Sequence, residues 1–215
     1  MKSKNDLLKI IGILSMIIDH VGYIFFPDIP IFRIIGRLAF PIFAFHIYIG
    51  TIYTQNFNRY ILRLLAFALI SQLPYTLAFQ ILTLNVLFTL LLAALLLRSI
   101  INKKWLVMIL IITIAYFIDF DAGIYGIFIP SLFYITKDRP GLTILTWIFW
   151  TSLFIGYSHP YYQLYGIIAV ILCLINKQFS FKIRITKWFF YIFYPSHLLI
   201  LATLSVVIFS PIFNK

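Results

Sequence analysis

Residues 7–26 read LLKIIGILSMIIDHVGYIFF, and this stretch decides the fold class. Its length is close to the ~20 residues that carry an α-helix across a hydrocarbon core of ~30 Å. Eight further apolar stretches follow along the chain, at 31–54, 60–81, 83–101, 105–119, 122–136, 141–157, 162–176 and 187–209. The sequence therefore predicts an all-α protein, a polytopic integral membrane helical bundle of about nine transmembrane helices that forms a single domain over residues 1–215.

The composition excludes a soluble domain of this size. Apolar residues make up 63% of the 215 residues and charged residues 11%, and the mean hydropathy is +1.03. A chain of this length has too little interior to bury that much apolar surface, so lipid must cover the remainder.

The basic residues predict the topology. The gaps on one side of the predicted membrane hold most of the 17 Lys and Arg residues, namely Lys2, Lys4, Lys9, Arg59, Arg63, Arg98, Lys103, Lys104, Lys137, Arg139, Lys177, Lys182, Arg184 and Lys187. By the positive-inside rule that side is cytoplasmic, which puts the N-terminus in the cytoplasm and the C-terminus, with Lys215, outside. The net charge of +11 is thus a topology signal, and no nucleic-acid partner is expected.

Three ionisable residues are predicted to meet at one depth in the membrane. The first two spans are joined by the tight turn at 27–30, and His20 and Arg37 each lie ~10 Å from it along their helices, at ~1.5 Å per residue. Asp19 precedes His20, and Arg33 shares a helix face with Arg37. An unpaired arginine there is costly, so we expect Asp19 or an anionic ligand to neutralise one of the two. The alternative is an ion pair that only locks the hairpin.

Other polar residues extend the candidate site. Tyr194 and His197 lie at i and i+3 around Pro195, and His197 is ~15 Å from Lys187 along the last helix, so that His20 and His197 can line one cavity. In the outer loop, Asp119 and Asp121 can receive a cationic group from outside, or they are simply solvated.

Lys9 and His20 are eleven residues apart, so they point the same way with ~16 Å between them along the helix. An elongated ligand with an anionic head, such as acetyl-coenzyme A, has that shape. The four histidines follow no zinc-binding pattern, and no metal site is expected.

Several blocks of the chain resemble the TraX proteins, integral membrane proteins whose founding member acetylates the N-terminal amine of conjugative F-type pilin. The resemblance is carried by IDHVG (18–22), RIIGRLAFPIFAF (33–45), RLL (63–65), SQLPY (71–75), NVLFT (85–89) and YIFYPSHL (191–198). More distant membrane acyltransferases often have a basic residue eleven positions before a catalytic histidine on the first helix, and Lys9 and His20 match that spacing.

The resemblance implies a membrane acyltransferase that takes acetyl from acetyl-coenzyme A, as co-substrate, to an amine or hydroxyl of a peptide, sugar or lipid. Transfer is expected at the extracytoplasmic side of a bacterial cytoplasmic membrane. The expected catalytic residues are His20, as general base or acyl carrier, and Asp19. Lys9 and Arg37 are expected to bind the coenzyme. The expected substrate-binding residues are Arg33, Arg37, Asp119, Tyr194 and His197.

Two other classes of function fit the same residues. A small transporter or flippase can bind and relay a substrate through intramembrane His, Asp and Arg residues. Against this class, the chain lacks repeated halves and its number of predicted spans is odd. A noncatalytic membrane chaperone for a secreted peptide also needs polar residues at one depth. Binding of acetyl-coenzyme A distinguishes the acyltransferase from both.

Overall fold

A computed structural model describes residues 6–156, 160–175 and 186–209. Its helices are α1 (Leu7–Phe25), α2 (Pro30–Gly36), α3 (Ala39–Tyr53), α4 (Phe57–Phe79), α5 (Val86–Ile101), α6 (Trp105–Phe117), α7 (Gly123–Ile135), α8 (Pro140–Phe154), the 3₁₀ helix η1 (Tyr161–Tyr165), α9 (Gly166–Ile175) and α10 (Lys187–Phe209). Apart from isolated bridge positions, such as the pair Leu84 and Phe120, the regular structure of this part of the chain is helical. The predicted all-α class is confirmed.

Four helical stretches in the described residues are long and apolar enough to cross a membrane, namely Leu7–Phe25, Pro30–Tyr53, Phe57–Phe79 and Trp188–Ile208. The other five predicted spans form shorter apolar helices of 10–17 residues. A 13-residue helix such as α7 covers only about 20 Å at about 1.5 Å per residue. The protein is therefore a helical membrane protein, while the side on which each terminus lies stays a prediction. Of the basic residues that support it, Lys2, Lys4, Lys177, Lys182, Arg184 and Lys215 lie outside the described residues.

The predicted span 31–54 is broken into α2 and α3 by Pro41. Proline has no N–H, and its ring clashes with the carbonyl four residues earlier, here that of Arg37. Accordingly α2 ends at Gly36, Arg37 and Leu38 form a turn, and α3 begins at Ala39. The break leaves Arg37 at a joint between two helices, beside the end of α1.

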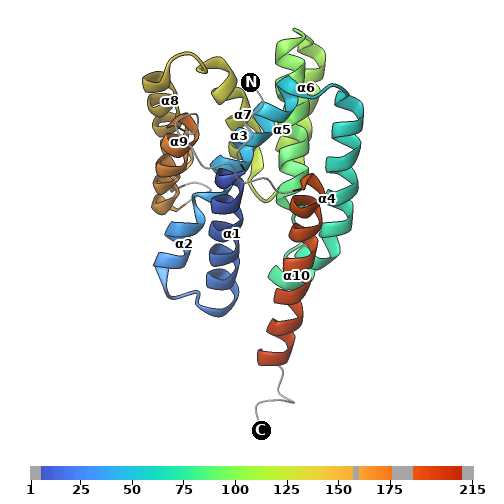
Figure 1. Ribbon diagram of the computed structural model, residues 1–215, viewed down its shortest axis with the longest axis vertical. Helices are drawn as coiled ribbons and strands as arrows, with labels where there is room; N and C mark the ends of the chain where they lie inside the picture. Colours follow the sequence, from blue (N-terminus) through green and yellow to red (C-terminus); the bar gives the residue numbers. More distant parts are fainter. Residues whose placement is uncertain (1–5, 157–159, 176–185, 210–215) are drawn as a thin grey trace.

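Figure 1 shows how the helices are arranged. Helix α3 is central and packs against α1, α5, α7 and α9. Helix α10 runs along α4, while α8 and α9 stand on the opposite side of the bundle. The short α2 folds back beside α1 from the turn after Phe25. This arrangement places α1 beside both parts of the broken second span and in contact with α10.

Candidate active site

A cavity of about 350 Å³ lies beside the C-terminal half of α1, where Met16, Asp19, His20 and Tyr23 line it. Helices α1 to α5, α7, η1 and the α6–α7 connection all contribute to its wall. The polar and charged side chains in that wall are Asp19, His20, Tyr23, Arg33, Arg37, Tyr75, Asp121, Tyr125, Tyr162 and Gln163. Aromatic and aliphatic side chains, including Phe40, Phe43 and Phe79, supply the rest.

Asp19 is held by Arg33 of α2 and by Arg37 of the turn that follows α2. Its Oδ1 lies 3.0 Å from Nη1 of Arg33 and 2.8 Å from Nη2 of Arg37, and Arg33 also donates to the Asp19 carbonyl at 3.3 Å. The helices come this close because residue 36 is glycine, and a Cβ there would overlap the Asp19 carboxylate. The predicted ion pair is therefore present, with one carboxylate serving two arginines, while the depth of these residues in the membrane stays a prediction.

The two arginines differ in how fully they are engaged. Arg37 donates from Nε to the Arg33 carbonyl at 3.1 Å and from Nη1 to Oε1 of Gln163 at 3.0 Å, in addition to its bond to Asp19. Within the described part of the chain, Arg33 donates from Nη1 alone. Since a guanidinium has five N–H donors, Arg33 retains donors for a ligand in the cavity. Both arginines were predicted to bind a ligand, and Arg33 has more free donors for that role than Arg37.

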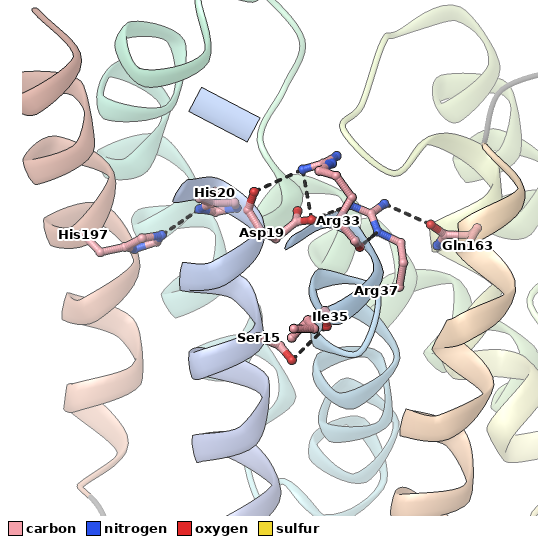
Figure 2. A network of polar contacts seen from close by, with 8 residues as sticks. All are labelled: Ser15, Asp19, His20, Arg33, Ile35, Arg37, Gln163 and His197. Carbon is pink, nitrogen blue, oxygen red and sulfur yellow. Dashed lines mark hydrogen bonds and ion pairs between the residues drawn. The ribbon is translucent and has the colours of Figure 1, made fainter. Parts of the chain in front are cut away.

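His20 and His197 form a hydrogen-bonded pair, although they are far apart in the sequence. Nδ1 of His20 lies 2.9 Å from Nε2 of His197, and the two rings are stacked with centroids 5.1 Å apart. Figure 2 shows the polar row that results, from His197 on α10 through His20 and Asp19 on α1 to the arginines and Gln163. His20 lines the cavity, whereas His197 is only 7% exposed and reaches the cavity through His20.

The hydrogen bonds assign a tautomer to each histidine. Nδ1 of His197 lies 3.1 Å from the carbonyl of Phe193, which can only accept, so this nitrogen carries the proton. Nε2 of neutral His197 is then an acceptor, and Nδ1 of His20 donates to it. Nε2 of His20 is left unprotonated, the state that a general base or a nucleophile requires. His197 therefore orients His20, which differs from the direct substrate contact that the sequence predicted for it.

The loop acid in the cavity is Asp121, two residues beyond the predicted Asp119. The backbone of Leu84 binds this loop on both sides, donating to the Asp119 carbonyl at 2.9 Å and accepting from the Asp121 amide at 2.9 Å. A turn follows, which Gly123 completes with a φ of +51° that suits glycine. Asp121 lines the cavity and accepts a hydrogen bond from the Tyr75 hydroxyl at 2.9 Å, whereas Asp119 is exposed and outside the cavity wall.

A second, mostly apolar cavity of about 260 Å³ lies between α1, α3, α4, α5 and α10. Lys9 is in its wall, where its Nζ lies 2.6 Å from Asp6 and 4.9 Å from the centroid of the Phe190 ring. Tyr194, predicted to bind the substrate, lines this apolar cavity and is not in the wall of the polar one. Lys9 and His20 thus stand on one face of α1, as predicted, but in two different cavities.

Sequence reasoning assigned no role to five polar groups of the polar cavity, namely Tyr23, Tyr75, Tyr125, Tyr162 and Gln163. Gln163 stands in the tyrosine-rich stretch at 161–165, where an amide inside an apolar span is itself a signal of a buried polar partner. Tyr75 belongs to the SQLPY block, whose role is visible only once α4 is placed beside the α6–α7 connection. The expected catalytic role of Asp19 stays a prediction, although the structure occupies its carboxylate with the two arginines.

The fold and the cavity define a helical membrane protein with an intramembrane site of histidines, arginines and carboxylates. The family model described as TraX protein matches residues 4–205, and the chain belongs to the TraX family.

Two curated proteins are similar over parts of the chain. An uncharacterized protein of Rickettsia prowazekii (strain Madrid E) is 37% identical over 86 residues, which is 38% of this chain and 32% of that protein. The probable fimbrial assembly protein FimC, serogroup H1, of Dichelobacter nodosus is 34% identical over 159 residues, 64% of each chain. The chain therefore spans less than two thirds of the length of both relatives. No solved structure matches it.

Proposed function

We propose that this protein is a membrane-embedded acyltransferase of the cytoplasmic membrane, which transfers acetyl from acetyl-coenzyme A to an amine or hydroxyl at the extracytoplasmic side. The observation that carries the proposal is the histidine pair: His197 holds His20 with an unprotonated Nε2 in the wall of a polar cavity. General bases of this kind contribute about 10²–10⁴-fold to a reaction rate. An acceptor that enters the cavity can give its proton to that nitrogen.

The transfer requires no group beyond donor, acceptor and His20. The acceptor nitrogen or oxygen forms a bond to the thioester carbonyl carbon, and Nε2 of His20 takes the proton that the acceptor loses. The carbon–sulfur bond then breaks, and the departing coenzyme A thiolate recovers that proton from the imidazolium. Arg33, which uses only Nη1 among the described residues, offers N–H donors in the same cavity wall to the negative charge that develops on the carbonyl oxygen.

The apolar cavity supports entry of acetyl-coenzyme A from the predicted cytoplasmic side. Its wall holds Lys9, the predicted coenzyme-binding residue, at the end of α1 that the positive-inside rule places in the cytoplasm. The same face of α1 continues through Ile13 and Met16 to His20. An anionic head bound near Lys9 therefore has an apolar path towards the histidine pair.

The polar cavity and the family together support an amine acceptor on a pilus-type subunit. Asp121, aligned by Tyr75, offers a carboxylate to a protonated amine that arrives from the outer end of the bundle. Membership of the TraX family and the name of the Dichelobacter nodosus relative, a fimbrial assembly protein, point to pilus assembly. Asp121 then binds the protonated amine, which first loses one proton through the Asp121 carboxylate to water; the neutral amine that results attacks the thioester and gives its second proton to His20.

The test is isothermal titration of the detergent-purified protein with acetyl-coenzyme A. We expect saturable binding that Lys9→Ala weakens by about tenfold, the effect of one hydrogen bond to a charged group. His20→Ala retains binding, because His20 acts on the acceptor. Lys104→Ala is the matched control, since Lys104 is an exposed lysine on the same predicted side and outside the wall of the apolar cavity.

Absence of binding to monodisperse protein would reject the acyltransferase. The transporter would then be the better hypothesis, because the same cavity residues can bind and relay a substrate without a coenzyme.

A further inference from the structure

We infer that Met16, Phe43 and Val86 set the largest acyl group that this protein can transfer, an inference that rests on the proposed function. These three residues line both cavities, the polar one that contains His20 and the apolar one that contains Lys9. They come from three different helices, α1, α3 and α5. They therefore form a partition that any group passing between the two cavities must cross.

The partition lies on the route from Lys9 to His20. Lys9, Ile13, Met16 and His20 follow one face of α1 at intervals of four, three and four residues. Met16 lies about 6 Å from His20 along the axis, at about 1.5 Å per residue. An acyl group carried in the apolar cavity reaches the histidine pair only after it has passed Met16.

The side chains of the partition leave little room. Met16 is 7% exposed and packs with Ala39, Tyr75 and Tyr194 in one buried cluster, against which Phe43 and Val86 also pack. Val86 is fixed in the first turn of α5, whose N-cap Asn85 is fully buried and hydrogen-bonded to Gln72. Met16 is therefore the adaptable member, since methionine is unbranched and has three rotatable bonds.

The size of the opening should appear as selectivity between donors. In a tight apolar site one methylene changes selectivity by about 10–200-fold. An acetyl group adds a single methyl beyond the carbonyl, whereas a hexanoyl group adds a five-carbon chain that must displace the partition. Free coenzyme A has no acyl group, so its affinity reports the remainder of the donor site and leaves the partition untouched.

The experiment is isothermal titration with coenzyme A, acetyl-, butanoyl- and hexanoyl-coenzyme A for the wild type and three variants in the same detergent. For the wild type we expect at least a tenfold loss of affinity from acetyl to hexanoyl. Met16→Ala should reduce the ratio of acetyl- to hexanoyl-coenzyme A affinity by about tenfold. Val86→Phe should weaken acetyl-coenzyme A binding by about tenfold. Both variants should bind free coenzyme A like the wild type, which also verifies their folding.

Leu14→Ala is the control for a truncation on α1, because Leu14 is 54% exposed and lines neither cavity. It should leave every affinity unchanged. Equal acetyl-to-hexanoyl ratios in the wild type, Met16→Ala and Val86→Phe, with acetyl-coenzyme A still bound, would overturn the partition and leave the proposed function standing. Failure of the wild type to bind any of the four ligands would overturn both.

Discussion

Asp19 and His20 are neighbours on α1, yet the structure uses them in opposite ways. The side chains of adjacent helical residues diverge by about 100°, so Asp19 faces α2 and His20 faces α10. The Asp19 carboxylate meets two arginines, one of which is bonded in three directions. Among the described residues, His20 has one hydrogen-bond partner, His197, on its Nδ1, and its Nε2 has none. Asp19 and its two arginines therefore hold helices together, whereas Nε2 of His20 is the atom that we propose to react.

The largest effect should come from breaking the charge cluster. Asp19→Asn leaves two arginines facing each other without a carboxylate, and loss of one partner of a buried ion pair typically costs about 3–5 kcal/mol. We expect the lower end, about 3 kcal/mol, because these side chains retain 15–20% exposure. The measurement is the midpoint of thermal unfolding in detergent, which should fall markedly.

Asp28→Asn serves as the control for this prediction, since Asp28 is exposed in the α1–α2 turn. If Asp19→Asn unfolds at the wild-type temperature, the cluster does not hold the hairpin.

The next effect concerns how His20 is oriented. His197→Leu removes the acceptor for the Nδ1 proton of His20, so its tautomer is no longer fixed, and kcat for acyl transfer should fall by about 100-fold. His197→Gln places an amide oxygen near the position of the lost Nε2 and should restore most of kcat. KM for acetyl-coenzyme A should not change in either variant. If His197 serves only in packing, kcat of His197→Gln should not exceed kcat of His197→Leu.

A smaller effect separates the two acids of the outer loop. Asp121→Asn should raise KM for an amine acceptor by about tenfold, because it removes a charged hydrogen-bond partner, and should leave a hydroxyl acceptor unaffected. Asp119→Asn should leave both unchanged, since Asp119 is exposed outside the cavity wall. Steady-state kinetics with both acceptors checks this. A larger rise in KM for Asp119→Asn than for Asp121→Asn would instead support the sequence prediction that Asp119 binds the substrate.

The sequence predicted the helices well because each apolar stretch carries its own signal. The positions of Asp19, His20 and the two arginines were also predictable, since the turn at 27–30 fixes the depth of both flanking helices. The break at Arg37 was harder to place, because the proline that causes it lies four residues later.

The sequence predicted that His20 and His197 can line one cavity, but it did not predict the hydrogen bond between them. The bond between His20 and His197 depends on how α10 packs along α4 and beside α1, and no local pattern encodes that packing. The choice of Asp121 over Asp119 depends on a backbone pairing with Leu84. The role of His197 as the partner of His20, and the place of Asp121 rather than Asp119 in the cavity wall, are therefore visible only in the tertiary structure.

The central claim is that His20 is the reacting group and that its role is separable from stability. The most direct test incubates wild-type and His20→Ala protein with radiolabelled acetyl-coenzyme A and bacterial envelope components, and counts the label transferred to the acceptor. We expect transfer to fall by at least about 100-fold, with the unfolding midpoint and acetyl-coenzyme A affinity unchanged. Transfer at the wild-type rate by His20→Ala would contradict the claim.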